Sequence, residues 1–470
     1  MDYIANQLGL PTEFLAICSC LVSSFPLALL YNHIPKSNPI LRHWFCFLST
    51  SSIIILLFGV TSYLNVLVPT LITYGLTSIA GGDRLVPILV SVGVIVQLFI
   101  LHVQIQLLHA NDLTYVNIST PMMVMAIKLS LFAWSVYDGT RSTKDLDSDM
   151  VPFAIKEMPD LIEYLGFIFY FATFWVGPAF DYQYYYEYTR SIGPYTRKSA
   201  SLNAGLRVLG LGILMMIMFV TVDTRWGASA LFNGPFFTNY TVLERIGVVQ
   251  LTGFSVRAKF AAAWKLSEAA AILTGLGSNG IDPKTNQELH DRLDNVDILQ
   301  VELGQSPKQV VDGWNKKTAG WLKRCVYLRI IPFAPTSVAT GVTNLVSAFW
   351  HGVYPGFYLA FGSGTFIVLA GRTLRRHLRP LFVAEKAKFK WLKPVYDFFG
   401  FVFTMSVLNY LFTSFFARWA IKSLQIWYAM YFFGHIGMIA VIGGFWLYDK
   451  TSRREHVSEE IKSNFKSKSE

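Results

Sequence analysis

The stretch SAFWHGVYPGFYLAF, which runs from Ser347 to Phe361, places a Trp-His-Gly triplet between two apolar runs. With their flanking residues these runs cover 326–349 and 352–371, and each is long enough to cross a bilayer as a helix. We therefore expect a tight hairpin that points into or across a membrane. An ionisable side chain at that depth is costly and usually marks a path or a site, so His351 requires an explanation.

The composition extends this expectation to the whole chain. Of the 470 residues, 53% are hydrophobic and only 15% are charged, whereas a soluble protein has about 25% charged residues. This balance excludes an ordinary soluble domain and predicts an all-α polytopic membrane protein with about eleven transmembrane helices. The short apolar segments 69–80 and 227–238 are expected to be re-entrant or interfacial. The expected spans are 13–31, 44–68, 85–109, 121–137, 161–180, 204–222, 244–276, 326–349, 352–371, 395–417 and 424–448.

One transmembrane domain, residues 1–450, is expected to account for nearly the whole chain, followed by a basic tail, residues 451–470, that is disordered at its end. The N-terminus lacks the basic segment that opens a signal peptide, so the first span is expected to stay in the mature chain. The four cysteines lack zinc-like spacing, and we interpret them as small buried residues. No metal site is predicted. The cysteines are Cys18, Cys20, Cys46 and Cys325.

Clusters of positive charge predict how the spans are oriented. The loop from residue 371 to 394 carries one acid, Glu385, and eight basic residues, and the tail after Lys450 is also basic. Because an excess of Lys and Arg marks cytoplasmic loops, this loop and the C-terminus are expected to be cytosolic. The net charge of +10 favours anionic lipid headgroups over nucleic acid as a partner. The eight basic residues are Arg372, Arg375, Arg376, Arg379, Lys386, Lys388, Lys390 and Lys393.

Two interpretations of His351 follow from the residues themselves. It is either a core histidine bonded to a neighbouring carbonyl, or a functional base, because a site shielded from water favours the neutral imidazole that can accept a proton. Ser347 lies four residues earlier and on the same helical face. Its hydroxyl either orients the imidazole or a substrate, or it bonds back to its own helix.

The wider sequence TNLVSAFWHGVYPGFYLAF resembles the signature of the membrane-bound O-acyltransferase family, which pairs an intramembrane histidine with an upstream asparagine in a Trp-Asn context. Here that context is DGWNKKTAGWLKRCVYLR, so the matching asparagine is Asn315. The stretches GFIFYFATFWVGPAFDYQYYYEY, AAAWKLSEAAAILTGLGSNG and NDLTYVNISTPMMVMAIKLSLFAWSVYDG resemble its lysophospholipid acyltransferase branch. The resemblance extends from about residue 10 to about residue 450.

This resemblance implies a helix bundle around a central chamber in the endoplasmic reticulum membrane. Acyl-coenzyme A, a co-substrate and not a bound cofactor, is expected to enter from the cytosol, and a lysophospholipid from the bilayer. His351 would deprotonate the free glycerol hydroxyl, and Asn315 would hold a reacting group or the thioester oxygen. No covalent acyl-enzyme is needed, because two substrates that converge in one chamber gain much of the rate from proximity.

Several further residues are expected to contact substrate. For Glu268 the alternative to substrate contact is a buried ion pair or a helix contact. For the tyrosine-rich stretch from 182 to 188 the alternative is an interfacial aromatic belt. Arg190, Arg197 and Lys198 after that stretch are suited to phosphate groups. His102 and His109, seven residues apart, do not have the spacing of a metal pair, and His435 is expected to form a hydrogen bond between helices. The expected substrate-binding residues are Ser347, Trp350, Trp314, Glu268, Asp181 and Tyr182.

Two other functions fit the sequence less well. A relative that acylates a sterol, a diacylglycerol or a secreted peptide would share the same motifs. A proton-coupled transporter with His351 on its path would normally show an inverted repeat or several acids along its spans, and neither is present in the sequence. Headgroup preference, acyl-chain preference, the depth of Asn315 and the choice between monomer and homodimer stay open.

Overall fold

The computed structural model describes residues 3, 7, 11–109, 116–196, 200–385 and 387–466. Arg197, Lys198, Lys386 and the end of the tail, residues 467–470, lie outside the described residues. Within the described ranges the regular structure is helical, and the one β-type pairing is an isolated bridge between Ile281 and Glu288. The expected all-α class is therefore confirmed.

Seven helical segments are long and apolar enough to cross a membrane, among the residues that are described. An eighth span results if the bent pair of α19 (Ala420–Ala429) and α20 (Phe433–Lys466), whose axes differ by 78°, is one broken span. The chain is thus a multi-pass membrane protein, although the number eleven is not confirmed. The seven segments are α2 (Thr12–His33), α3 (Pro39–Ala80), α4 (Leu85–Leu108), α5 (Ser119–Gly139), Leu202–Phe232 with α9 (Leu202–Trp226) and η4 (Ala228–Phe232), α17 (Pro355–Val383), and Lys390–Ala417 with η6 (Lys390–Leu392) and α18 (Lys393–Ala417).

Shorter helices connect these spans. The expected span 161–180 is broken into α6 (Leu161–Ile168) and α7 (Phe171–Phe174), and segment 69–80 is the end of α3 and not a separate element. The long, less apolar α11 covers Val242–Thr274. The other short helices are η1 (Thr143–Asp145), η2 (Val151–Phe153), α8 (Tyr182–Thr189), η3 (Gly193–Tyr195), α10 (Gly234–Thr238), α12 (Ile298–Glu302), α13 (Pro307–Gly313) and α14 (Lys316–Leu322).

The expected span 326–349 is also irregular. It consists of a π-helical turn, η5 (Lys323–Tyr327), then α15 (Leu328–Ile330) and α16 (Thr336–His351). Pro332 and Pro335 lie in the gap before α16, where each removes a backbone donor and disfavours a continuous helix. Irregular backbone at membrane depth is tolerated where protein buries it or water reaches it, which makes this segment a candidate region for a site.

The chain divides into two compact units. The first comprises residues 1–221, 257–297 and 314–353, and the second comprises residues 222–256, 298–313 and 354–470. The expectation of one domain over 1–450 stays a prediction. All the predicted site residues belong to the first unit.

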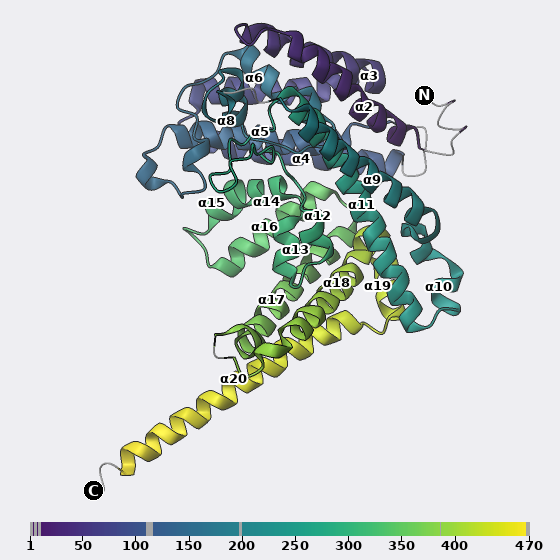
Figure 1. Ribbon diagram of the computed structural model, residues 1–470, viewed down its shortest axis with the longest axis vertical. Helices are drawn as coiled ribbons and strands as arrows, with labels where there is room; N and C mark the ends of the chain where they lie inside the picture. The colour runs from purple at the N-terminus through teal and green to yellow at the C-terminus, as the bar shows by residue number, and fades with distance from the viewer. Residues whose placement is uncertain are drawn as a thin grey trace. The chain divides into compact units, whose positions relative to one another are not determined.

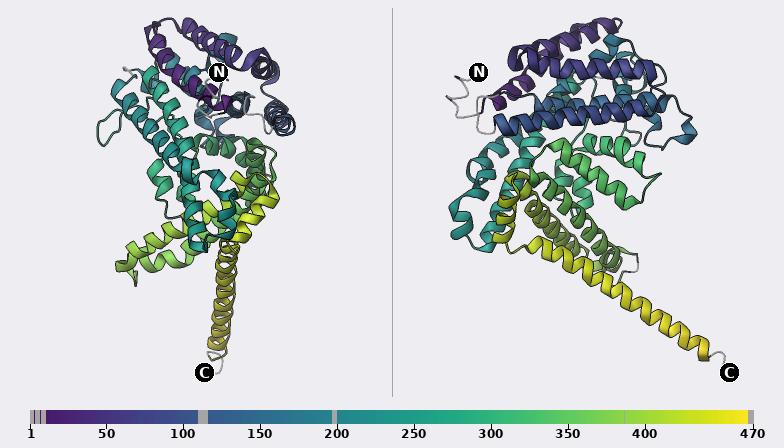
Figure 2. Two further views of the ribbon diagram at one scale, coloured as in Figure 1. Left: turned by 90° about the vertical axis from the view of Figure 1, so that its right-hand side faces the viewer. Right: turned by 180° about the vertical axis from the view of Figure 1, so that it is seen from behind.

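Helix α5 lies at the centre of the first unit. In its most apolar 18-residue stretch 83% of the helix is buried, whereas the corresponding share is 33% or less for α2, α3 and α4. Those three helices therefore leave most of their surface to lipid. Helix α3 contacts α2, α4 and α5, and α4 also contacts α5. Figures 1 and 2 show these helices running alongside one another.

A buried lysine compensates the break between α6 and α7. Lys128 of α5 is fully buried, and its Nζ donates to the carbonyl oxygens of Phe167 at 2.5 Å and Ile168 at 3.1 Å. The same ammonium lies 4.4 Å from the ring centre of Phe167 and 4.5 Å from that of Phe180. Carbonyls that a broken helix leaves without intrahelical donors are thereby satisfied inside the protein.

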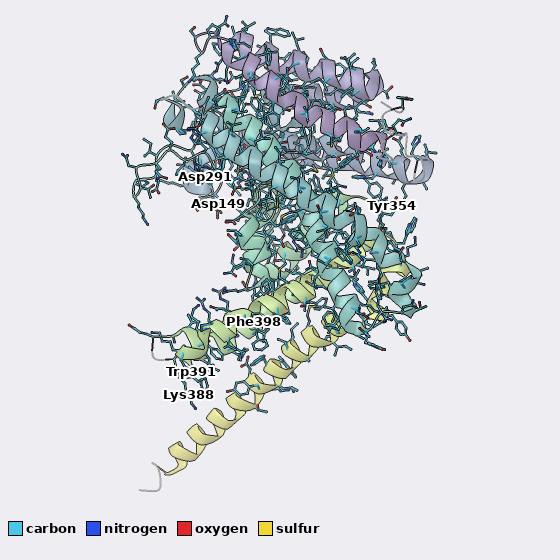
Figure 3. The ribbon with its side chains drawn as sticks, turned by 45° about the vertical axis from the view of Figure 1, so that its right-hand side comes forward. Asp149, Asp291, Tyr354, Lys388, Trp391 and Phe398 are labelled. Atoms are coloured by element: carbon cyan, nitrogen blue, oxygen red, sulfur yellow. The ribbon has the colours of Figure 1, made fainter. Side chains whose placement is uncertain are left out.

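The second unit is built around α17, α18, α19 and α20. His435 connects three of these helices, because its Nδ1 is 2.7 Å from the hydroxyl of Tyr410 and its Nε2 is 3.2 Å from that of Ser363. The expected helix–helix hydrogen bonding of His435 is therefore present. Figure 3 shows Lys388, Trp391 and Phe398 at one end of α18, where Trp391 is 76% exposed.

Candidate active site

His351 is the last residue of α16, and the chain conformation explains why the helix ends there. Gly352 has a φ of 127° and a ψ of −164°, a conformation that residues with a side chain rarely adopt. Its N–H donates to the carbonyl oxygens of Ala348 and Phe349 at 3.2 and 3.1 Å. The imidazole is thus presented at a helix terminus, followed within four residues by Pro355, the first residue of α17.

Trp350 anchors the end of α16 to the central helix. Its side chain is buried, and its Nε1 donates to the carbonyl oxygen of Met123 in α5 at 2.9 Å. The indole lies edge-on to the imidazole of His351, with ring centres 4.7 Å apart, and its centre is 6.1 Å from that of Trp321 in α14. These contacts hold the indole of Trp350 beside His351, and its expected contact with substrate stays a prediction.

The C-terminal half of α4 completes the surroundings of His351. Phe99 of α4 lies 5.8 Å from Phe349, measured between ring centres. His102, one turn further along α4, interacts with the backbone of Trp350 and is close enough to His351 for the two imidazoles to interact electrostatically. The sequence raised His102 only as a discounted metal ligand, because nothing in the spacing of α4 and α16 predicts that they meet.

Ser347 is buried on the same helix, four residues before His351. One turn earlier, the hydroxyl of Thr343 donates to the carbonyl oxygen of Ala339 at 2.7 Å, which is the ordinary back-bond of a helical hydroxyl. The hydroxyl of Ser347 has no hydrogen bond to any residue in the described ranges. It is therefore available to a substrate or to the imidazole.

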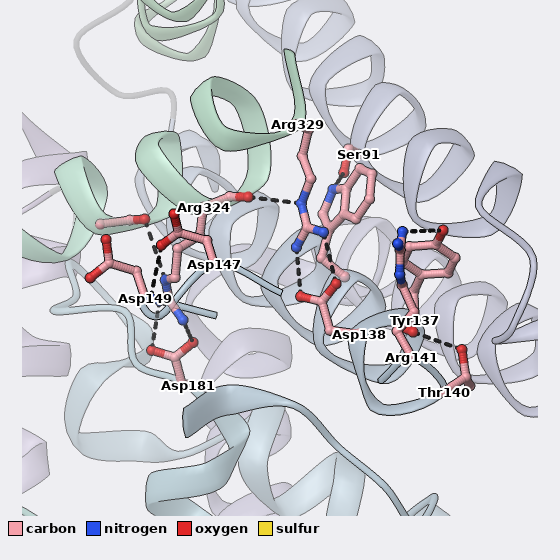
Figure 4. A network of polar contacts seen from close by, with 12 residues as sticks. Ser91, Tyr137, Asp138, Thr140, Arg141, Asp147, Asp149, Asp181, Arg324 and Arg329 are labelled. Carbon is pink, nitrogen blue, oxygen red and sulfur yellow. Dashed lines mark hydrogen bonds and ion pairs between the residues drawn. The ribbon is translucent and has the colours of Figure 1, made fainter. Parts of the chain in front are cut away.

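Two ion pairs between partly buried arginines and buried aspartates hold the irregular segment before α16. Arg324 of η5 makes two hydrogen bonds, of 2.7 and 2.9 Å, to the carboxylate of Asp181. Arg329 of α15 likewise bonds the carboxylate of Asp138, at the end of α5, at 2.7 and 2.6 Å. Figure 4 shows both forks. Asp181 was expected at the substrate entrance, which stays a prediction, and in the structure its carboxylate accepts two hydrogen bonds from Arg324.

Asn315 stands at the N-terminus of α14 in a left-handed conformation, with φ 46° and ψ 52°. Asparagine tolerates this region better than most residues with a side chain. Its Oδ1 accepts a hydrogen bond of 3.2 Å from Nδ2 of Asn295. Trp314, just before it, lies 5.0 Å from Trp264 of α11, measured between ring centres.

Helix α14 links the asparagine to the histidine. It rises about 9 Å from Asn315 to Trp321, and the indole of Trp321 is the one that lies against Trp350. The indole nitrogen of Trp321 also donates to the hydroxyl of Ser130 in α5 at 2.8 Å. Helices α14 and α16 are in contact, so one packed assembly carries both expected catalytic residues.

Glu268 belongs to a charge network beside Asn315. Its Oε2 lies 2.8 Å from Nζ of Lys265, which in turn donates to Asp294 at 2.6 Å, and Lys316 pairs with the same aspartate. Burial alone would raise the pKa of Asp294, but Lys265 and Lys316 hold that pKa below its usual value. The buried pair offered as the alternative for Glu268 is therefore present.

Tyr182 is likewise hydrogen-bonded to another side chain of the protein. Its hydroxyl donates to Oε1 of Glu163 at 2.7 Å, and Arg190 bonds both oxygens of that carboxylate at 2.5 and 2.9 Å. Among the residues that the structure describes, the side chains of Ser347 and Trp314 have no hydrogen bond, and the substrate contacts expected for all six residues stay a prediction.

Apolar spans packed around a helix-terminal imidazole, in one assembly with an asparagine held outside ordinary helical geometry, are features of a polytopic membrane enzyme. The sequence profile of the membrane-bound O-acyltransferase family matches residues 104–413, and the chain belongs to this family. It is 33% identical to a lysophospholipid acyltransferase of Schizosaccharomyces pombe, over 94% of this chain and 88% of that protein. It is 32% identical to a lysophospholipid acyltransferase of Saccharomyces cerevisiae, over 92% and 74%, and 27% identical to lysophospholipid acyltransferase 2 of Arabidopsis thaliana, over 94% and 95%.

Proposed function

We propose that the chain is an acyl-coenzyme A-dependent lysophospholipid O-acyltransferase, which transfers a fatty acyl group to the free glycerol hydroxyl of a lysophospholipid. The similarity to lysophospholipid acyltransferases of two yeasts and a plant, over most of each chain, supports the acceptor class. The structural observation that carries the proposal is the position of His351, which ends α16 beside the buried Trp350 and four residues after the buried Ser347.

In the proposed reaction the neutral imidazole of His351 takes the proton of the glycerol hydroxyl. The hydroxyl oxygen attacks the thioester carbonyl, the carbon–sulfur bond breaks, and the leaving coenzyme A thiolate takes the proton from the imidazolium. Nδ2 of Asn315 donates to the thioester oxygen as negative charge develops there. A pre-oriented amide donor of this kind contributes about 3 kcal/mol to lowering the barrier.

We further propose that the protein resides in the endoplasmic reticulum membrane with its C-terminus in the cytosol, where acyl-coenzyme A is available. The basic loop between α17 and α18 supports this orientation, because Lys388 and the exposed Trp391 are suited to a headgroup layer on the cytosolic side. Acyl-coenzyme A acts as a co-substrate, and the active form is a monomer or a homodimer.

A panel assay tests the acceptor class. The detergent-purified full-length protein is given radiolabelled oleoyl-coenzyme A with lysophospholipids of choline, ethanolamine, serine or inositol headgroup, or with diacylglycerol or cholesterol. The account predicts labelled diacyl phospholipid from at least one lysophospholipid. Label only in triacylglycerol or sterol ester would overturn the proposal, as would no transfer to any acceptor by a folded sample.

A further inference from the structure

Asn295 meets the start of α14 through three hydrogen bonds. It is 1% exposed and lies in the loop that follows α11. Its backbone carbonyl accepts from the N–H of Lys316 at 2.9 Å, its Oδ1 accepts from the N–H of Lys317 at 3.0 Å, and its Nδ2 donates to Oδ1 of Asn315 at 3.2 Å. A residue 20 positions earlier in the chain thus satisfies the first two backbone donors of the helix.

This arrangement changes what Asn315 does at the helix terminus. An asparagine at an N-cap normally turns its own side-chain oxygen onto the second or third N–H of its helix. Asn315 makes no such cap, and the second N–H, that of Lys317, is already taken by Asn295. The side chain of Asn315 is therefore released from the capping role that its position would otherwise give it.

The same bonds determine which end of each amide faces which partner. The backbone N–H of Lys317 can only donate, so the atom of Asn295 that meets it is the oxygen, Oδ1. The other atom of that amide is then Nδ2, which donates to Asn315, so the atom of Asn315 that faces it is Oδ1. The NH₂ group of Asn315 consequently points away from Asn295, and it has no hydrogen bond to a described residue.

The loop that carries Asn295 is itself fixed by charge. The preceding residue, Asp294, pairs with Lys265 of α11 and with Lys316 of α14. The ammonium of Lys317 donates to the carbonyl oxygen of Arg292, two residues further back, at 2.5 Å. Asn295 is therefore a rigid point from which an amide can be held in one orientation.

We propose that Asn295 is a positioning residue, which holds the side-chain amide of Asn315 with its NH₂ group toward the reacting thioester. The proposal rests on the function proposed above, in which that NH₂ group stabilises the developing oxyanion. Without Asn295 the amide of Asn315 is free to rotate, or to cap α14 itself, and the donor is lost from the site in most molecules.

The test is Asn295→Asp, which keeps the shape and the acceptor for Lys317 but replaces the donor to Asn315 with an oxygen. A misplaced catalytic group lowers kcat by about 10- to 100-fold, and we expect such a loss with little change in KM for acyl-coenzyme A or lysophospholipid. Asn279→Asp is the matched control, because Asn279 lies in the same loop and its Nδ2 donates to the exposed Asp291. It should keep wild-type kcat.

A double substitution shows whether Asn295 acts through Asn315. Asn295→Asp should cause no further loss of kcat when it is added to Asn315→Gly. Losses that multiply would overturn the proposal, because they would mean that Asn295 acts independently. If Asn315→Gly alone has wild-type kcat, the catalytic role of Asn315 fails instead. Asn295→Ser, which is too short to make both side-chain bonds, replaces Asn295→Asp if the latter does not fold, and wild-type kcat in a folded Asn295 variant would also overturn the proposal.

Discussion

Substitution of Asn315 separates the conformation of this residue from its chemistry. The left-handed backbone, with φ 46°, suits glycine fully and alanine poorly, so Asn315→Ala should unfold more easily than Asn315→Gly by about 1 kcal/mol. Asn315→Asp keeps the side-chain shape and the oxygen that accepts from Asn295, but its second oxygen cannot donate. The three variants thus differ in backbone strain and share the loss of the amide donor.

The expected activities follow from that shared loss. Removal of one oriented donor to an oxyanion lowers kcat by about 100- to 1000-fold, which corresponds to about 3–4 kcal/mol. All three variants should therefore show a similar fall in kcat, whereas their thermal midpoints should differ, with Asn315→Gly above Asn315→Ala.

Two measurements on the purified proteins check this prediction. Initial rates with radiolabelled acyl-coenzyme A and a lysophospholipid give kcat, and intrinsic fluorescence on heating gives the midpoint. The reasoning is refuted if kcat follows the thermal midpoint across the three variants, or if Asn315→Gly keeps the wild-type rate, because either result would assign Asn315 a purely structural role.

Three further outcomes are expected. Gly352→Ala forces a side chain into a backbone with φ 127° and should lower the free energy of unfolding by about 1–3 kcal/mol. It should also lower kcat, because His351 is adjacent. A wild-type melting curve would contradict this. Asp138→Asn leaves Arg329, whose side chain is 12% exposed, without its carboxylate and should cost about 3–5 kcal/mol. The exposed control Asp312→Asn, in an ion pair with Lys308, should cost less than about 1 kcal/mol, and chemical denaturation measures both. Asn239 begins an exposed Asn-Tyr-Thr sequon between α10 and α11, which the proposed orientation places in the lumen. Endoglycosidase should therefore change the electrophoretic mobility of the wild type and not that of Asn239→Gln. A wild type of unchanged mobility would count against that orientation.

The sequence predicted the membrane class well, because long runs without charge are a direct consequence of the cost of placing ions in lipid. It predicted poorly where an apolar segment is broken into separate helices. The window from 161 to 180 is as apolar as a span, yet the chain forms α6 and α7 there, because Lys128 of another helix satisfies the carbonyls at the break. Hydropathy averaged along one segment contains no information about such a partner.

In the candidate site, too, the sequence marked some residues and gave no sign of others. His351 stood out because an imidazole in an apolar run is unusual, and Asn315 followed from the family motif. Asn295 and His102 had no local signal, since their roles depend on long-range contacts with Lys317 and Trp350. Glu268 carried a signal that suited both a site and a buried pair, and its contact with Lys265 shows the pair.

Whether His351 is the catalytic base is measured by the turnover of His351→Gln, which keeps a polar side chain of similar reach but cannot act as the base. The matched control is His33→Gln, at the exposed end of α2. With acyl-coenzyme A binding measured separately and the melting curve unchanged, we expect His351→Gln to lose about 100- to 10,000-fold in kcat and His33→Gln to match the wild type. A folded His351→Gln protein that turns over at the wild-type rate would show that His351 is not the base.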